Sequence, residues 1–175
     1  MAAAFRRVPA PALEAFAAGI FRFHGLPPLD AQTVAHTLVL ADLRGVDSHG
    51  VLRTGVYVER LKRGLINPTP KLRALKEGPG TALLDGDNGM GPVVATAAMR
   101  LALEKARATG MGAVAVRRGN HYGMAAAYPL IALAEDCIGL TLTNGPALVA
   151  PWGGDRKSTR LNSSHIQKSR MPSSA

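Results

Sequence analysis

The sequence predicts an α/β protein, in which a helical amino-terminal segment precedes a partial mixed sheet covered by helices. Three observations lead to this fold class. Apolar residues make up 47% of the 175 residues and charged residues 19%, the balance of a globular protein with a real core. Apolar positions recur at helical spacing before residue 66. From about residue 71 the pattern alternates as strand, strand, helix, strand, helix and strand.

Three helices are expected in the first part of the chain. Apolar positions have helical spacing over residues 11–24 and 30–46, and Asp30 is the expected N-cap of the second helix. Ser48 is the expected cap of a third helix over residues 49–65. The stretch "INPTP" ends that helix, because two prolines so close together cannot lie in a helix interior.

The second part alternates between strands and helices. Its elements, in order, are expected to be strands at 71–78 and 81–87, a helix at 92–110, a strand at 111–119, a helix at 124–137 and a strand at 138–144. A Gly-Pro-Gly turn separates the first two strands, and Gly110 is the natural end of the long helix. Helices between strands are typical of a sheet with helical cover.

These patterns divide the chain into three segments. Residues 1–66 form the helical segment, residues 67–154 an incomplete α/β domain, and residues 155–175 a tail that is rich in Ser, Arg and Lys. The tail has two interpretations, a disordered basic extension or a foreign sequence introduced when the gene was assembled. We favour the second, because the pattern of strands and helices stops before the sheet is complete, just after a strand whose residues look buried.

The net charge of +9 raises the alternative of a non-enzymatic module that binds nucleic acid. The last 21 residues carry five Lys/Arg and one Asp, so residues 1–154 keep 21 − 5 = 16 basic and 12 − 1 = 11 acidic residues, a net charge of only +5. Their cations are scattered among apolar residues, without interleaved aromatics that could stack on bases. A charged solvated face explains them better, and no nucleic-acid partner is expected.

Neither a membrane span nor a disulfide framework is expected. No stretch is long and apolar enough to cross a bilayer, and the alanine-rich start is interrupted by Glu14 and Arg22, which argues against a signal peptide. The single cysteine, Cys137, excludes internal disulfides and suits a reducing cytoplasm, and a buried thiol is expected there.

The stretch "DSHGVLRTGVY" contains the first candidate site. On a helix, His49, Arg53 and Tyr57 would share one face, with Ser48 just before them. A histidine one turn from an arginine gains nothing from local pairing, but the set suits an anion: Arg53 can grip a carboxylate while its neighbours donate hydrogen bonds. The alternative is an exposed polar face whose order is accidental.

The stretch "RRGNHYGMAAAY" contains the second candidate site. His121 follows a strand and precedes a helix, where open α/β sheets place ligand-binding groups. A histidine there can act as a general acid or base near neutral pH, with Asn120 capping the helix. The alternative is that Asn120 and His121 merely form a capped turn.

Other motifs indicate no further chemistry. The glycines of "LLDGDNGMGP" do not fit G-x-G-x-x-G, and Asp85 and Asp87 would repel a pyrophosphate, so a tight turn is expected. No cluster of His, Cys or carboxylates has metal-ligand spacing, so no metal is expected. The loop "TNGPALVAPWGG", which follows a strand end, is a possible lining of a site.

Four motifs occur together in order: "DSHGVLRTGVY", "LLDGDNGMGP", "GNHYGMAAAY" and "LTNGPALVAPWGG". With them the chain resembles the malate/L-lactate dehydrogenase family, which includes ureidoglycolate and sulfolactate dehydrogenases. The resemblance runs from about residue 8 to Gly154 and covers about the first half of a full-length member. It implies a sulfolactate-dehydrogenase-like fold that is distinct from the usual dinucleotide-binding fold.

The resemblance also implies an activity and a set of site residues. Members use NAD or NADP to interconvert small 2-hydroxy and 2-oxo acids, and they are typically homodimers. Carried over by motif, Ser48, Arg53 and Tyr57 would bind the substrate, while His121 and His49 would be catalytic. Asn144 would approach the cofactor.

The chain departs from the family after the "APWGG" loop. Members continue there through further strands that hold most of the cofactor, whereas this chain enters "DRKSTRLNSSH". The resemblance therefore implies a truncated, amino-terminal part of a dehydrogenase. We expect the 175-residue chain itself to be inactive.

Overall fold

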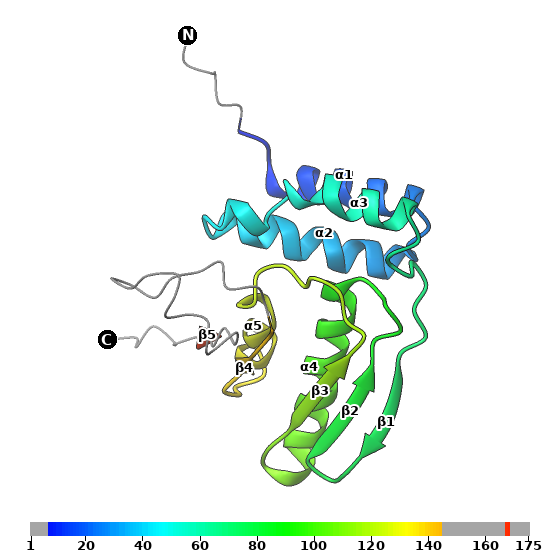
Figure 1. Ribbon diagram of the computed structural model, residues 1–175. Helices are drawn as coiled ribbons and strands as arrows, with labels where there is room; N and C mark the ends of the chain where they lie inside the picture. The colour runs from blue at the N-terminus through cyan, green and yellow to red at the C-terminus, as the bar shows by residue number, and fades with distance from the viewer. Residues whose placement is uncertain (1–6, 145–166, 169–175) are drawn as a thin grey trace, which may run out of the picture.

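The computed structural model describes residues 7–144 and 167–168 of the chain. Three helices lie together above a layer that contains a three-stranded sheet and two further helices (Figure 1). In chain order the elements are α1 (Ala10–Phe23), α2 (Pro28–Leu43), a 3-10 turn η1 (Asp47–His49), α3 (Arg53–Lys62), β1 (Arg73–Glu77), β2 (Thr81–Asp85), α4 (Gly91–Thr109), β3 (Ala113–Arg117), α5 (Ala127–Leu133), β4 (Leu140–Thr141) and β5 (Gln167–Lys168). The predicted α/β class with a helical start is confirmed.

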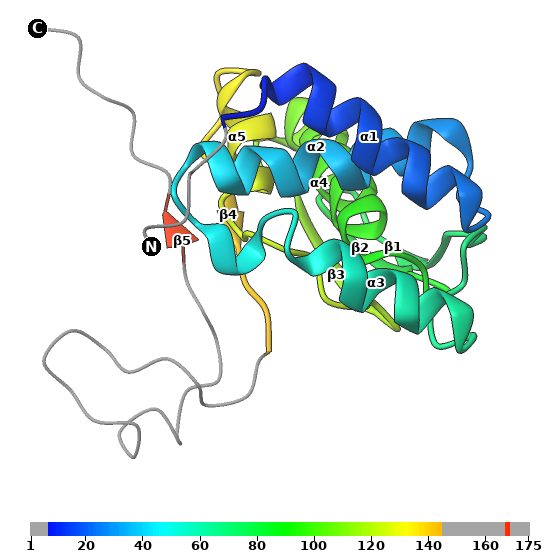
Figure 2. The same cartoon turned by 90° about the horizontal axis from the view of Figure 1, so that it is seen from above.

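The helix α2 joins the upper helices to the layer below. It packs against α1 on one side and against α4 and α5 on the other, and Figure 2 shows it running between α1 and α3. The main core cluster, drawn chiefly from α1 and α2, consists of Ala17, Ala18, Phe21, Leu26, Ala31, Val34, Ala35, Leu38, Tyr57, Ile66 and Met90. Alanine, valine and leucine make up most of this cluster.

The starts of the second and third helices differ from the prediction. The helix α2 begins at Pro28, and Asp30 lies in its first turn without capping it. Proline fits there, because the first helical N–H groups have no partner within the helix. The helix predicted over residues 49–65 is shorter and begins at Arg53, so Ser48 is not its cap. The stretch before it closes into η1 instead.

The sheet is mixed, with the strand order β1-β2-β3. The strand β2 pairs antiparallel with β1 and parallel with β3, and α4 connects the two parallel strands. Leu84, Val94 and Ala98 are buried between the sheet and α4. The helix α4 ends at Gly110, which adopts the left-handed conformation (φ 83°), as predicted for its C-terminal glycine.

The last predicted strand and helix are shorter than expected. Pro129 lies in the first turn of α5, where a proline is tolerated. Instead of a strand over residues 138–144, the structure has the two-residue strand β4, which pairs with β5 and not with the three-stranded sheet. Cys137, expected to be buried, is only partly buried. None of the described helices is long and apolar enough to cross a membrane.

The three predicted segments stay a prediction. In the structure, the change from helices to alternating strands and helices falls between Lys62 and Arg73. The remaining sequence up to Gly154 and most of the predicted tail lie outside the described residues.

Candidate active site

The turn that carries Ser48 and His49 is fixed to α2 by an aspartate. Asp42 accepts a hydrogen bond from the backbone N–H of Val51 (2.9 Å). Gly50 lies directly against the same carboxylate, so any side chain at this position would collide with it. The glycine of "SHG" is therefore explained by packing: it lets the turn close over Asp42 and so keeps His49 in η1, before α3 begins.

The first residue of α3 is Arg53, whose side chain turns back toward η1. Its Nε donates a hydrogen bond to the carbonyl oxygen of Ser48 (2.6 Å). Among the described residues, no hydrogen bond or ion pair engages its two terminal nitrogens. A guanidinium that is fixed at Nε and open at both terminal nitrogens is suited to bind a carboxylate with two parallel hydrogen bonds.

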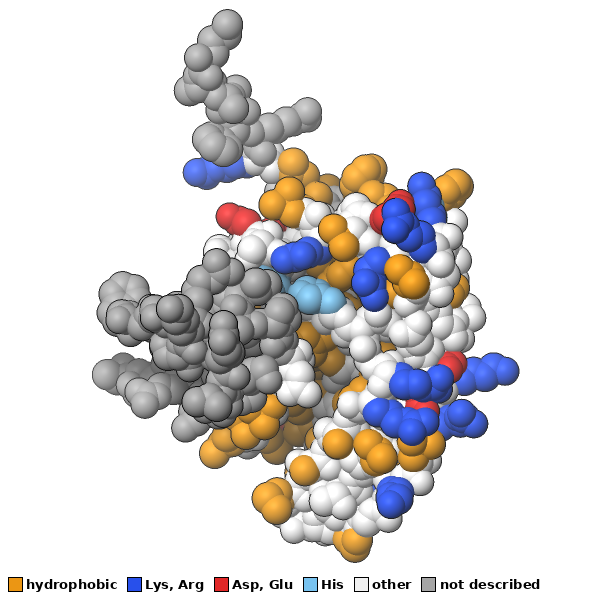
Figure 3. All heavy atoms as spheres, in the orientation of Figure 1, with side chains coloured by type: hydrophobic (Ala, Val, Ile, Leu, Met, Phe, Trp, Pro, Cys, Tyr) orange, Lys and Arg blue, Asp and Glu red, His pale blue; other side chains and the backbone are white. Residues whose placement is uncertain are grey.

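His121 lies beside these residues, although it is far from them in sequence. The hydroxyl oxygen of Tyr57 is 2.8 Å from His121 Nδ1, and the ring of His49 stacks on that of His121 with centroids 5.5 Å apart. Ser48 Oγ is in turn 2.9 Å from His49 Nδ1. Figure 3 shows histidine side chains at the surface of this face, with lysine or arginine side chains beside them.

The two partners of His121 Nδ1 define its tautomer. The backbone N–H of Gly123 donates to Nδ1 (3.3 Å), and a backbone N–H can act only as a donor. Nδ1 must therefore be an acceptor, so the phenol of Tyr57 also donates to it. Burial, opposed by the charge of Arg53, raises the pKa of Tyr57 to about 12 and keeps the phenol protonated. The ring proton of neutral His121 is thus placed on Nε2.

The surroundings also keep His121 neutral. Partial burial of the ring, followed by the positive charges of Arg53, His49 and Arg60, lowers the pKa of His121 to about 4. At pH 7 the ring is therefore a neutral imidazole, which carries one proton. Because Arg53 contributes to this shift, an anion that binds Arg53 will remove part of its effect and raise the pKa of His121.

Two predictions about how the site residues lie are wrong, namely those for His49 and Asn120, while the binding role of Tyr57 stays a prediction. His49 does not lie on the helix with Arg53 and Tyr57, but η1 still brings it to the same place. Tyr57 is buried, 2% exposed, and its hydroxyl points to His121. Asn120 does not cap the following helix, because α5 begins only at Ala127.

Instead of capping a helix, Asn120 ties two loops together. Its Nδ2 donates to the carbonyl oxygens of Asn88 (2.9 Å) and Gly89 (3.0 Å), in the turn between β2 and α4. Gly91 packs against the backbone of His121 and Asn120 so closely that a Cβ would lie 2.6 Å from the Asn120 oxygen. The sequence pattern predicted the glycine-rich stretch only as a tight turn. In the structure this stretch also supports the backbone of His121.

The acidic residues of that turn are engaged within the protein. Buried Asp85 accepts hydrogen bonds from Arg117 (3.0 Å) and Arg118 (2.8 Å). The bonds from Arg118 and from the Asp87 N–H lead the causes that hold its pKa well below its usual range. This network fixes the end of β2 to the end of β3, just before His121.

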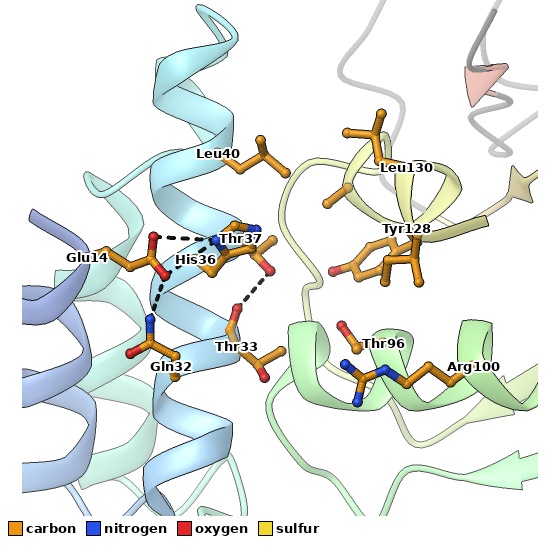
Figure 4. Close-up of a pocket in the computed structure, with 12 residues that line it drawn as sticks. Glu14, Gln32, Thr33, His36, Thr37, Leu40, Thr96, Arg100, Tyr128 and Leu130 are labelled. Atoms are coloured by element: carbon orange, nitrogen blue, oxygen red, sulfur yellow. Dashed lines mark hydrogen bonds and ion pairs between the residues drawn. The ribbon is translucent and has the colours of Figure 1, made fainter. Parts of the chain in front are cut away.

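A separate groove of about 440 Å³ lies between α2, α4 and α5. In Figure 4, Glu14, Gln32 and His36 form a bonded group on one side, and Tyr128, Thr96 and Arg100 lie on the other. None of the predicted site residues lines it. His36 is a surface residue beside Glu14.

Among the described residues, no hydrogen bond, ion pair or ring contact joins Asn144 to the other predicted site residues. Asn144 is exposed, after β4, and its backbone oxygen accepts a hydrogen bond from Thr143 (3.3 Å). Within the described part of the chain, no group of three His, Cys, Asp or Glu side chains is placed to hold a metal ion.

Replacing Tyr57 by Phe is expected to shift the tautomer of His121. The variant loses one of the two donors to Nδ1, and a net hydrogen bond of about 1 kcal/mol corresponds to roughly a fivefold change in the ratio of tautomers. The ¹⁵N chemical shifts of the His121 ring report that ratio in the purified chain. An unchanged ratio in folded Tyr57→Phe would contradict the assignment of Tyr57 as a donor.

Comparisons with known proteins agree on one family. The family model described as malate/L-lactate dehydrogenase matches residues 8–163. A malate dehydrogenase of Pyrococcus abyssi is 50% identical over 148 residues, which are 85% of this chain and 41% of that protein. The chain thus spans about two fifths of the length of this protein and of two other curated relatives that it matches.

Solved structures give the same result. The malate dehydrogenase of Pyrococcus horikoshii superposes with a TM-score of 0.81 at 48% identity, over 85% of this chain and 43% of that chain. The sulfolactate dehydrogenase of Methanocaldococcus jannaschii gives 0.79 at 41% identity, over 84% and 43%.

Proposed function

Because the chain belongs to the malate/L-lactate dehydrogenase family, we propose that it provides the substrate-binding part of an oxidoreductase for small 2-hydroxy and 2-oxo acids. The observation that carries this proposal is the convergence of an anion-binding guanidinium and a neutral histidine. Arg53 is near enough for its charge to lower the pKa of His121, and Tyr57 holds the ring in place. A substrate with a carboxylate next to a hydroxyl or carbonyl group needs an anion-binding group and a proton-transferring group side by side.

Arg53 would bind the substrate carboxylate and so orient the carbon next to it. The open terminal nitrogens of Arg53 would form the two hydrogen bonds, while Ser48 and His49 would contact the carboxylate or the neighbouring oxygen. Such anchoring restricts the reacting carbon to one position, which is a large part of the catalytic effect in bimolecular reactions. Tyr57 belongs to this set as the residue that orients His121.

His121 would transfer the proton. In the direction of oxidation, the ring proton would first move from Nε2 to Nδ1, where the hydroxyl oxygen of Tyr57 can accept its hydrogen bond, and Nε2 would then take the proton of the 2-hydroxyl group. The bound carboxylate would offset the charge of Arg53 and so favour the imidazolium that forms. In the direction of reduction, the ring returns this proton to the oxygen of the 2-oxo acid. His49, stacked on the ring, would help to polarise that oxygen.

A nicotinamide cofactor, NAD or NADP, would supply or accept the hydride when bound. The glycine-rich turn does not suit its phosphates: Gly86, Gly89 and Gly91 pack against neighbouring protein atoms, so this turn is no open cradle for a pyrophosphate. We propose that the cofactor is held mainly by the part of the relatives' length that this chain does not span, with Asn144 at its border. On this basis we expect the 175-residue chain to bind the acid without turning it over. For a protein of family length we expect a cytoplasmic homodimer.

The alternative of a nucleic-acid-binding module has less support. Several cations in the described part of the chain are paired with carboxylates, namely Arg63, Lys105, Arg107, Arg117 and Arg118. Paired cations contribute less to phosphate binding, because the carboxylate competes for the same charge.

Oxamate, a stable analogue of a 2-oxo acid, tests the proposed function in the purified chain. Its binding should raise the pKa of His121, so by linkage its affinity should rise as the pH falls toward about 4, the pKa of the ligand-free ring, by at most about tenfold per pH unit for one proton. Calorimetric titration at several pH values measures this slope.

Arg53→Gln should abolish oxamate binding and its pH dependence. Arg63→Gln is the matched control, because Arg63 lies just after the same helix and pairs only with Glu59 among the described residues. Equal oxamate affinity in both variants would overturn the substrate site.

Oxidation of NADH with pyruvate or oxaloacetate by the 175-residue chain would contradict its expected inactivity.

A further inference from the structure

One arginine of α3 is tied to the loop that carries His121. Arg60 is partly buried, one turn beyond Tyr57, and its Nη2 donates to the side-chain oxygen of Asn120 (2.9 Å). Its Nε is buried and has no hydrogen-bond partner among the described residues. A solvated surface cation would show neither feature, although the sequence pattern grouped Arg60 with such cations.

The amide of Asn120 is the meeting point of three segments. Its oxygen accepts from Arg60 on α3, and its Nδ2 donates to the carbonyl oxygens of Asn88 and Gly89 in the turn before α4. An arginine can only donate and a carbonyl can only accept, so the orientation of the amide is unambiguous. Because Asn120 directly precedes His121, the position of the catalytic ring depends on this amide.

The helix α3 therefore holds the loop at two successive residues. Tyr57 bonds to the ring of His121, and Arg60, three residues later, bonds to the side chain of Asn120. Residues three apart lie on the same side of a helix, so both contacts come from one face of α3. We infer that Arg60 is a positioning residue of the active site, which fixes His121 through Asn120. This role rests on the proposed function only in that His121 is the proton-transferring group.

The charge of Arg60 acts in the same direction as its hydrogen bond. Four groups face the His121 ring with charge or polarity: Arg53, Arg60 and Tyr57 from α3, and His49 from η1. Burial is the largest cause of the lowered pKa of His121, and Arg60 is one of three cations that add to it. Loss of Arg60 should thus both loosen the loop and raise the pKa of the ring.

The test is an NMR titration of His121 in the ligand-free 175-residue chain, with exchange of the Asn120 side-chain amide as a second readout. Arg60→Gln should raise the pKa of His121 by about half a unit or more and speed amide exchange by about tenfold. Arg60→Lys should keep the low pKa, because it keeps the charge, while the amide still exchanges faster. Arg63→Gln, the control, should change neither.

A folded Arg60→Gln chain with unchanged titration and unchanged exchange would overturn the inference. If this variant does not fold, Asn120→Ser breaks the same link from the other side; because serine has no side-chain amide, this variant is judged by the His121 titration alone. None of these measurements needs substrate or cofactor. Oxamate binding fails if the proposed function is wrong, whereas the titration fails only if Arg60 does not position His121.

Discussion

Replacing His121 by Gln should lower kcat by about a thousandfold, within the range of 10²–10⁴ that a general acid or base contributes. The substrate carboxylate would still be held by Arg53, so KM for the acid should change little. The measurement needs a protein of family length. A chimera that joins residues 1–154 of this chain to the carboxyl-terminal remainder of Pyrococcus horikoshii malate dehydrogenase provides one, because the two structures superpose over the matched part.

His36→Gln is the matched control for His121→Gln. This histidine is exposed on α2, beside Glu14, and lines the groove away from the predicted site residues. The control chimera should keep the activity of its parent. A loss of less than tenfold in His121→Gln, in a chimera whose parent is active, would remove His121 from the proposed mechanism.

Replacing Gly91 by Ala should destabilise the fold and displace the catalytic loop. The new methyl group would lie 2.6 Å from the backbone oxygen of Asn120 and even nearer to that of His121, and backbone atoms cannot turn aside as a flexible side chain can. Overpacking of this kind costs about 1–3 kcal/mol. Urea unfolding followed by circular dichroism measures the loss, and the His121 ring resonances should shift in the folded variant.

Gly55→Ala is the control for Gly91→Ala. Gly55 lies inside α3 with no atom within 4 Å of the new methyl group, so alanine should raise stability by about 0.4–1 kcal/mol through a less flexible unfolded chain. Neither glycine has a positive φ, so the contrast between the two variants isolates the steric contact. Equal stability of both variants would contradict the packing of Gly91 against the His121 loop.

The order of helices and strands could be predicted because it depends on local patterns. Helical spacing of apolar residues, the proline pair of "INPTP" and the stop at Gly110 act within a few residues. The boundaries of the helices and strands were harder to predict, because local patterns do not include contacts with residues farther along the chain. Ser48 looks like a cap by its neighbours alone, but the contact of Gly50 with Asp42, eight residues earlier, draws the chain into a 3-10 turn.

The candidate site was predicted residue by residue, but not as an arrangement. The motif around His49, Arg53 and Tyr57 supplied candidates from one segment, and His121 supplied one from another. Arg60 and Gly91 were missed, because a cation between apolar residues and a glycine in a turn are common features without a specific signal. Only the bond to Asn120 and the backbone contact of His121 distinguish these two residues.

The sequence by itself determined the α/β class, the order of the elements and the family motifs, because propensity, capping and motif spacing are properties of neighbouring residues. The tertiary structure alone decided that Tyr57 meets His121 across 64 positions and that Arg60 meets Asn120 across 60. It also decided the charge state of His121, whose pKa of about 4 depends on burial and on cations from other segments. Such interactions act through space, so they exist only once the fold has brought these segments together.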